Sequence, residues 1–290
     1  FDSAADLEDN WEVVQFPCVV KPLTLSGSLG VIRANDKDEL ISAARRIETL
    51  LAQPELRNRI VDTAGETLLV EEYLPGAEFA VEGLLDNGAL RVLAIFDKPD
   101  PLEGPAFAET IYVTPSRAAT DIQEAIRVAV THAAKALGLS WGPLHAEVRV
   151  NDGGVWVIDV AARTIGGLCA RCLRFGTGMS LEEILLRQAC HLPIETLERE
   201  RLAAGVMMIP VPQAGVFEMV DGVEVARSVP LVEDIQISIA HGTAVAPLPD
   251  SDRYVGFIFA RGGSPAEVEA ALRACFAQLE IIIRPAGDTH

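Results

Sequence analysis

The chain has 290 residues, of which 49% are hydrophobic, and it carries a formal net charge of −18. This length allows two compact units with a substantial core. The acidic charge argues against a nucleic-acid backbone as partner, because that role needs clustered Lys and Arg, and no apolar run is long enough to span a membrane.

The start of the chain and its cysteines bear on its origin and compartment. Phe1 is not a natural start, and the acidic segment 1–13 is unlike a secretory or transit peptide. We therefore interpret residues 1–15 as the remnant of an upstream linker or N-terminal domain. The five cysteines are scattered, which favours reduced thiols in a cytoplasmic protein. Cys169 and Cys172 have redox or zinc spacing, but no second pair completes a four-ligand site, so we expect a structural role.

The first chemical signal is a lysine at the end of a short strand. Residues 16–22 predict a buried strand that ends in Lys21, and the small residues Ser26, Gly27 and Ser28 follow. Small residues let backbone N–H groups approach an anion, and the lysine adds a point charge. The lysine precedes the glycines, so the segment is not a Walker loop. The alternative is a surface lysine before a flexible turn.

An acidic cluster comes next along the chain. Asp36 and Glu39 predict the start of a helix over 37–52, and a strand over 67–70 leads into the segment Glu-Glu-Tyr-Leu-Pro-Gly-Ala-Glu at 71–78. Acids placed directly after a buried strand, and again after a Pro-Gly turn, are unusual, although they could simply cap strands and face water. Residues 79–85 and 89–96 then predict a hairpin.

Capping signals predict three further helices. Thr120 with Gln123 opens a helix that ends at 137, and Ser180 with Glu183 opens one that ends near 191. Ser264 caps a helix over 265–279. From about residue 203 the Val- and Ile-rich runs predict short strands of a separate small α+β unit.

A second hairpin, over 144–160, brings two carboxylates together. A three-residue turn at 152–154 would place Glu147 opposite Asp159, where like charges repel. A hard divalent cation such as Mg²⁺ between them would remove the conflict. A two-residue turn would instead put Asp159 opposite Ala146, and the acids could equally be solvated. The pairs expected from the three-residue turn are Asn151 with Val155, Arg149 with Val157, and Glu147 with Asp159.

Taken in order, these motifs resemble the ATP-grasp superfamily. They are a strand ending in Val-Val-Lys-Pro, a small-residue loop, the segment Val-Glu-Glu-Tyr-Leu-x-Gly-x-Glu, and a Glu…Asp hairpin followed by Ala-Arg-x-x-Gly-Gly. The part beyond 202 is similar to the tail domain of the L-amino-acid ligase branch. The resemblance implies an α+β fold: an ATP-grasp domain over 16–202, whose subdomains at about 16–70 and 71–202 clasp ATP, and a small α+β C-terminal domain over 203–290.

The resemblance also implies roles for the matched residues. Lys21 and the loop after it would contact nucleotide phosphates, the segment 71–74 would hold the adenine, and Glu78 would bind the ribose hydroxyls. The residues matched to ATP are Lys21, Ser26, Gly27, Ser28, Glu71, Glu72, Tyr73, Leu74 and Glu78.

The metal and catalytic residues follow from the second hairpin. The resemblance implies that Glu147 and Asp159 bind Mg²⁺, with Mn²⁺ as an alternative ion, and that Arg163 steadies the transferred phosphoryl group. One departure is Ala161, where many members have Asn, and it puts a full second metal shell in doubt.

Three other residues are weaker candidates for substrate contacts. Glu109 could bind a substrate amine, His145 could donate to a phosphate, and Arg171 could meet a carboxylate. The alternatives are a structural histidine and a surface arginine.

The function implied is an ATP-dependent carboxylate–amine ligase that forms a carbon–nitrogen bond through an acyl phosphate. Its partners would be small-molecule carboxylates and amines. A homodimer is possible as well. The alternatives are a degenerate nucleotide-binding regulatory module, which Ala161 favours, and a carboxylase or purine-pathway ATP-grasp enzyme. Family members usually carry an N-terminal α/β domain, so we expect this polypeptide alone to bind ATP weakly or turn over slowly.

Overall fold

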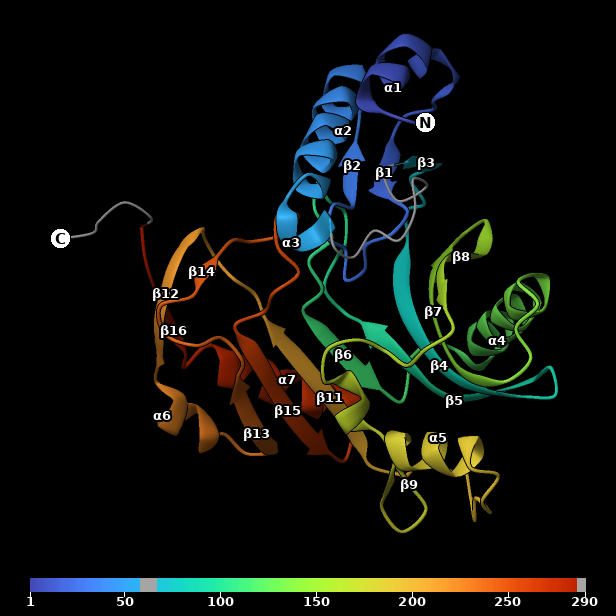
Figure 1. Cartoon of the computed structure of the whole chain (residues 1–290). Helices are drawn as coiled ribbons and strands as arrows, with labels where there is room; N and C mark the ends of the chain where they lie inside the picture. The colour runs from blue at the N-terminus through green and yellow to red at the C-terminus, as the bar shows by residue number, and fades with distance from the viewer. Residues whose placement is uncertain (58–66, 286–290) are drawn as a thin grey trace.

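An eight-stranded antiparallel sheet forms the body of the molecule (Figure 1). The structure, a computed structural model, describes residues 1–57 and 67–285. The strands of the sheet lie in the order β13-β15-β11-β6-β5-β4-β7-β8, and the mixture of strands and helices confirms the predicted α+β class. The strands are β4 (Ala77–Asp86), β5 (Ala89–Lys98), β6 (Ile111–Thr114), β7 (Gly142–Asn151), β8 (Gly154–Ala161), β11 (Ala203–Ile209), β13 (Val232–Ile237) and β15 (Gly256–Gly262).

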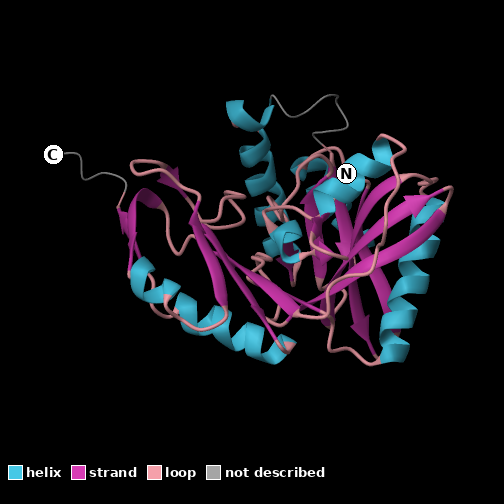
Figure 2. Ribbon diagram, turned by 90° about the horizontal axis from the view of Figure 1, so that it is seen from below, coloured by secondary structure: helices cyan, strands magenta, loops and turns pink. Residues whose placement is uncertain are grey.

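Two long helices cover one face of this sheet (Figure 2), and the shorter α5 (Leu181–Ala189) packs on part of the opposite face. Ile126 of α4 (Thr120–Ala136) packs into the cluster formed with β4 and β7, and Val268 of α7 (Pro265–Phe276) packs into the cluster formed with β11 and β15. The opposite face has an apolar cluster around Phe96 in its middle and charged side chains of β4 and β7 beside it. That second face is therefore the one available for a polar site.

The hairpin of β7 and β8 differs from the prediction near its turn. Asn151 pairs with Gly154 and Arg149 with Trp156, so the turn has two residues and the predicted three-residue turn was wrong. A β-bulge just beyond Glu147 then places one extra residue in β8. The bulge offsets the shorter turn, and Glu147 does pair with Asp159 as predicted.

The hairpin of β4 and β5 is longer than predicted. It turns at Asn87 and Gly88, whose φ values of 48° and 80° suit a two-residue turn. β5 reaches Lys98, which pairs directly with Glu78 across the ladder. The extra length of both strands carries charged residues into the uncovered face of the sheet.

A smaller N-terminal unit, residues 1–57 and 67–72, lies above the large sheet (Figure 1). Its three strands lie in the order β2-β1-β3, and α1 and α2 pack on them. Arg46 joins the unit to Asp250 in the C-terminal part through bonds of 2.8 and 2.6 Å. The elements are α1 (Ala4–Asn10), β1 (Cys18–Pro22), β2 (Ile32–Ala34), α2 (Lys37–Leu51), α3 (Pro54–Arg57) and β3 (Leu68–Glu72), with a 3₁₀ turn at Trp11–Val13.

The C-terminal part contributes to the large sheet and adds a small sheet of its own. β11 pairs with β6 on one side and β15 on the other, so the large sheet continues across the boundary expected between residues 202 and 203. The division into domains stays a prediction. The remaining elements are β9 (Arg174–Phe175), β10 (Met179–Ser180), α5 (Leu181–Ala189), α6 (Val223–Arg227), and the small sheet β14-β12-β16, made of β12 (Gly215–Asp221), β14 (Ala244–Val245) and β16 (Glu280–Arg284).

Most predicted helix caps are present. The side chains of Asp36, Ser180 and Ser264 each accept a hydrogen bond from the backbone N–H three residues on. Thr120 was wrongly predicted as a cap, because it is already the first residue of α4 and Ala119 precedes it without a side-chain bond. The Gln123 side chain instead donates to the carbonyl of Ala118, just before the helix.

The cysteines carry no disulfide within the described residues. Cys169 and Cys172 occupy a 3₁₀ turn and are buried. Burial raises the pKa of the Cys172 thiol to about 12, which leaves it protonated and unreactive at neutral pH. These features favour the structural role predicted for the pair.

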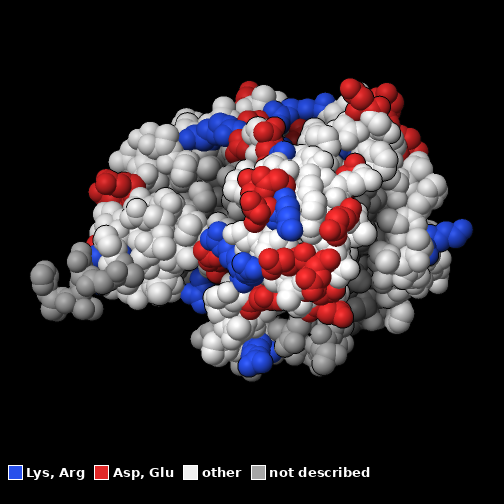
Figure 3. All heavy atoms as spheres, turned by 90° about the horizontal axis from the view of Figure 1, so that it is seen from above, with Lys and Arg blue, Asp and Glu red and all other residues white. Residues whose placement is uncertain are grey.

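Charge is distributed unevenly over the surface. Figure 3 views the molecule from the side of α1 and α2 and shows acidic groups interspersed with basic ones. One such pair, Arg45 with Glu8, joins the two helices at 2.6 Å. Over residues 1–57 and 67–285, no helix is both long enough and apolar enough to cross a membrane.

Gly76 is the glycine that the turn before β4 requires. Its φ is +127°, and a Cβ there would lie 2.2 Å from the carbonyl oxygen of Val150. We expect Gly76→Ala to lower the free energy of unfolding by about 2–4 kcal/mol, measured by urea denaturation.

Gly88→Ala is the matched control. Its φ of +80° is also positive, but no atom lies within 4 Å of the added Cβ, so a loss of only about 1 kcal/mol is expected. Equal losses in the two variants would show that the contact with Val150 is unimportant.

Candidate active site

A cleft of about 1330 Å³ opens between the N-terminal unit and the uncovered face of the large sheet. Of the residues predicted for the site, all except Arg171 line this cleft. They come from strands β1, β3, β4, β7 and β8 and from the loops between them. Residues that are about 140 positions apart in the sequence, such as Lys21 and Asp159, therefore line the same cleft.

The paired carboxylates Glu147 and Asp159 face the cleft from neighbouring strands. Burial and the adjacent charge of Glu147 raise the pKa of Asp159. Burial would raise the pKa of Glu147 as well, but the positive charges of Lys98 and His145 hold it well below its usual range. The two acids thus form an anionic pair in which Glu147 is already compensated and Asp159 is not.

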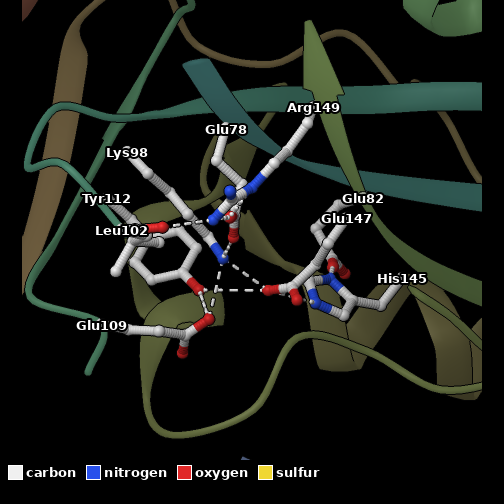
Figure 4. A network of polar contacts seen from close by, with 9 residues as sticks. All are labelled: Glu78, Glu82, Lys98, Leu102, Glu109, Tyr112, His145, Glu147 and Arg149. Atoms are coloured by element: carbon white, nitrogen blue, oxygen red, sulfur yellow. Dashed lines mark hydrogen bonds and ion pairs between the residues drawn. The ribbon is translucent and has the colours of Figure 1, made fainter. Parts of the chain in front are cut away.

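Lys98 is the centre of the site (Figure 4). Its Nζ lies 2.6 Å from Glu78 Oε1, 2.8 Å from Glu109 Oε1 and 2.6 Å from Glu147 Oε1. The side chain is only 3% exposed, and the three carboxylates keep its pKa well above the usual value although burial opposes the charge. Sequence reasoning missed this lysine, although its position at the end of a strand resembles that of Lys21.

Arg149 is a second cation that sequence reasoning missed. It lies opposite Glu78 in the β4–β7 ladder, and its Nε donates to Glu78 Oε2 at 2.9 Å. Its Nη atoms donate to the carbonyl oxygens of Leu74 at 2.7 Å and Leu102 at 2.5 Å. Glu78 therefore has both oxygens engaged by cations, and its predicted role toward a ribose stays a prediction.

Glu109 is held beside Lys98 by a phenol. Tyr112 donates a hydrogen bond from its hydroxyl to the same carboxylate oxygen that Lys98 contacts. Burial raises the pKa of Glu109, and Glu147 adds to that rise. One oxygen of the carboxylate is thus engaged by protein groups, and the predicted role of Glu109 toward a substrate amine stays a prediction.

His145 is fixed between two acids. Its Nδ1 lies 2.6 Å from Glu82 Oε1, and its Nε2 lies 3.8 Å from Glu147 Oε1. Burial opposes its positive charge, yet the two acids raise the pKa of His145 to about 9. The imidazole is therefore a cation at neutral pH and lines the cleft with Glu147.

An aromatic shelf marks one end of the cleft. The ring of Tyr73 stacks on Phe107 with centroids 6.4 Å apart, and the guanidinium of Arg33 lies 4.0 Å from the Tyr73 ring centroid. Lys21 is nearby in the same cleft and pairs with Glu71 at 2.5 Å. A flat, apolar shelf next to a lysine suits a planar ring that carries a phosphate chain.

The small-residue loop closes over this end. Gly27 and Ser28 both have positive φ, at 67° and 58°. Ser26, Gly27 and Ser28 all line the cleft, as do Glu72 and Leu74 of the segment after β3. The loop thus brings short side chains and main chain, rather than bulky groups, to the cleft.

The two predicted arginines beyond the hairpin lie in different places. Arg163 lines the cleft and donates to the carbonyl of Thr164 at 2.7 Å. Arg171 does not line it: its guanidinium pairs with Asp234 at 3.0 Å and lies 4.2 Å from the centroid of the Phe259 ring. The suggestion that Arg171 meets a substrate carboxylate finds no support in this arrangement.

Three carboxylates of the cleft already share a cation, Lys98, so the acids left to receive a further hard cation are the facing pair Glu147 and Asp159. Glu78, Glu109 and Glu147 each present an oxygen, and these oxygens lie within 4.8 Å of one another, with the Lys98 ammonium among them. Carboxylate oxygens are the ligands that Mg²⁺ prefers. Ala161 lines the cleft opposite His145, as predicted, and offers no side-chain ligand.

Two family models match the chain. The model described as an ATP-grasp domain matches residues 14–171. The model described as L-amino acid ligase C-terminal domain 2 matches residues 207–284.

Individual relatives agree with these matches. The chain is similar to the solved structure of an L-amino acid ligase from Bacillus licheniformis, with 33% identity and a TM-score of 0.82 over 97% of this chain and 67% of that chain. It is 23% identical to an uncharacterized protein of Sinorhizobium fredii, over 99% of this chain and 58% of the relative. It is 27% identical to dapdiamide A synthase of Enterobacter agglomerans, over 68% of this chain and 47% of the relative. The chain therefore spans about half the length of these two curated relatives.

Removal of the Lys98 charge tests the centre of the site. Lys98→Met would leave three carboxylates near one another without their shared cation, and we expect a loss of roughly 3 kcal/mol in the free energy of unfolding. Urea denaturation measures this loss. Lys135→Met on the exposed side of α4 is the control, with an expected change within about 0.5 kcal/mol. A Lys98 variant as stable as the control would contradict the central role of this ammonium.

Proposed function

The chain belongs to the ATP-grasp family, and from this premise we propose that it is an ATP-dependent ligase that joins a carboxylate, expected to be an amino acid, to an amine through an acyl phosphate. The products would be an amide, ADP and phosphate. The single observation that carries the proposal is the convergence of Glu147, Asp159 and Lys21 on one cleft from three separate strands.

The nucleotide would occupy the aromatic end of the cleft. The shelf formed by Tyr73 and Phe107 suits an adenine, and the backbone of the segment at 71–74 lies beside it. Lys21 would exchange its partner Glu71 for a phosphate oxygen, which is a stronger charge partner. The loop with Ser26 and Ser28 would then cover the phosphates with its N–H groups.

The metal would be held by Glu147 and Asp159. ATP-grasp enzymes bind ATP with Mg²⁺, and the facing carboxylates of this chain supply the oxygen ligands such an ion needs. Mg²⁺, when bound, would neutralise charge on the phosphate oxygens. Because Asp159 has no cation in contact within the described residues, it is the acid with the most to gain from an added ion.

Phosphoryl transfer depends mainly on positioning and on charge neutralisation. Arg163 lines the cleft and would steady the transferred phosphoryl group, as the family pattern implies. Lys98 would add a second positive charge from behind Glu78, Glu109 and Glu147, which line the cleft. Glu109 and Tyr112 would hold that lysine in place.

The second step needs an acyl phosphate and an amine in the same cleft. A carboxylate is a poor electrophile, so its phosphorylation supplies the leaving group that the amine displaces. Oriented donors stabilise the tetrahedral oxyanion, and Arg163 and His145 are the donors that line the cleft near the paired acids.

Ala161 favours a second candidate, a nucleotide-binding module without catalysis. It removes one side-chain ligand from the metal face, where it lies opposite His145. In this alternative the same residues would bind ATP, and no phosphate would be released for any carboxylate.

Phosphate release separates these functions. The full-length protein is incubated with ATP, Mg²⁺ and pooled amino acids, and we expect phosphate release that requires a substrate pair. ATP binding without release for any carboxylate would favour the regulatory module. Release that depends on bicarbonate would favour a carboxylase.

The metal assignment is tested by isosteric changes. Glu147→Gln and Asp159→Asn should each lower kcat by roughly 100-fold or more, because each removes an anionic ligand. Asp152→Asn on the exposed hairpin turn is the control and should retain the wild-type rate. Wild-type rates in both site variants would refute the assignment.

The nucleotide assignment is tested at Lys21. Loss of one charge-assisted contact with phosphate costs about 1.5–3 kcal/mol, so Lys21→Met should weaken ATP binding roughly 10- to 100-fold. Calorimetric titration with a non-hydrolysable ATP analogue measures the affinity. Lys135→Met should bind like the wild type, and an unchanged affinity in Lys21→Met would count against the role of this lysine.

A further inference from the structure

Glu82 is a buried acid that the proposed reaction leaves without a role. It lies on β4, directly opposite His145 of β7, and it is only 1% exposed. A buried carboxylate is costly unless it is paired, and an apolar pair of similar size would often be as stable or more so. The presence of an acid at this depth therefore calls for a reason beyond packing.

Glu82 determines the orientation of the His145 ring in the site. Glu82 Oε1 lies 2.6 Å from Nδ1, so the other nitrogen, Nε2, is turned toward Glu147 Oε1 at 3.8 Å (Figure 4). The two nitrogens of an imidazole lie on opposite sides of the ring, so a bond that holds one decides where the other points. The same logic makes carboxylates behind histidines important in metal sites.

The ladder around this pair is built irregularly. A β-bulge interrupts the β4–β5 pairing just beyond Glu82, and another interrupts the β7–β8 pairing just beyond Glu147. Bulges re-aim side chains and are over-represented near active sites. The β4–β7 pairing between the two bulges is itself regular, and it keeps Glu82 directly opposite His145.

Glu82 also reaches the segment that carries Arg163. Its carboxylate interacts with the backbone N–H of Ile165 and with the charge of Arg163. One buried acid is therefore bonded to the histidine beside the paired carboxylates and carries its charge near the arginine.

We propose that Glu82 is a positioning residue, which holds His145 so that Nε2 faces Glu147 and the cleft. The proposal rests on the ligase function proposed above for the rate effects that it predicts. Glu82 itself touches neither the substrates nor the metal ligands, and it acts through His145.

The first test is the rate of Glu82→Gln, which keeps the size of the side chain and removes its charge. We expect kcat to fall roughly 10- to 100-fold, as for other partners behind a functional histidine, with KM for ATP within twofold of the wild-type value. Asp97→Asn is the matched control, because Asp97 is also a buried acid of the same sheet, 7% exposed against 1% for Glu82, and it lies on the other face, where it pairs with Arg117 at 2.7 Å. An equal fall of kcat in Asp97→Asn would overturn the proposal.

A double-mutant cycle separates positioning from general support of the fold. If Glu82 acts through His145, Glu82→Gln should have little further effect on kcat in a protein that already carries His145→Gln. Additive effects of the two changes would overturn the proposal. If Glu82→Gln does not fold, Glu82→Asp takes its place, because it keeps the charge but is one methylene too short to reach Nδ1.

The ring itself supplies a readout that needs no turnover. The five histidines can be labelled with ¹⁵N, and the His145 signals identified by their loss in His145→Gln. We expect Glu82→Gln to shift the ring-nitrogen signals of His145 and Asp97→Asn to leave them in place, whereas unchanged signals in Glu82→Gln would overturn the proposal. A wild-type protein that releases no phosphate with any acid would overturn the ligase function alone, and the ring signals would still decide the role of Glu82.

Discussion

The site depends on an excess of negative charge held on one face of a sheet. Five carboxylates, Glu78, Glu82, Glu109, Glu147 and Asp159, meet three cationic side chains, Lys98, His145 and Arg149. In their ionised forms these acids outnumber these cations, although Lys21 and Arg163 add positive charge near Asp159. Such a cluster is costly in a protein interior, and burial raises the pKa of Glu109 and of Asp159 accordingly. The structure sustains it because Lys98 bridges three acids at once, and because the cleft stays open where a further cation would be needed.

Much of this arrangement could be read from local patterns. Lys21, the segment at 71–74 and the caps of α2, α5 and α7 each depend on residues close together in the sequence, and the structure places them as predicted. The facing of Glu147 and Asp159 was predicted for a reason only partly right. The turn is one residue shorter than expected, and a bulge adds that residue back. No clear sequence signal marks the bulge here. The sequence alone therefore could not show that a shorter turn and a bulge together give the predicted pairing of Glu147 with Asp159.

The residues that were missed have their partners far away in the sequence. Lys98 and Arg149 become neighbours of Glu78 only through the β4–β5 and β4–β7 ladders, and nothing in their own segments indicates a cluster of acids. Arg171 also has its partners far away in the sequence, but they place it outside the site. It was a weak candidate beyond the Gly-Gly pair, and its partners Asp234 and Gln236 lie on β13, more than 60 residues on, where they hold the guanidinium outside the cleft lining. Charge pairing between strands is thus the level at which sequence reasoning failed, because propensity and spacing describe one segment at a time.

The regions matched by the two family models share one sheet and one apolar cluster in this chain. β11 runs into the start of the C-terminal match at residue 207 and lies between β6 and β15 of the large sheet, and the apolar cluster around Phe96 includes Met208 and Phe257 from the matched region. Met208 and Phe257 also line the cleft. The same region holds the N-terminal unit through the bidentate bond of Asp250 to Arg46, and that unit carries Lys21 and the small-residue loop. A change in the C-terminal region would therefore reach the nucleotide end of the cleft by two routes, through the sheet beneath it and through the contact above it. This arrangement argues that the C-terminal region is part of the site rather than an appendage to it.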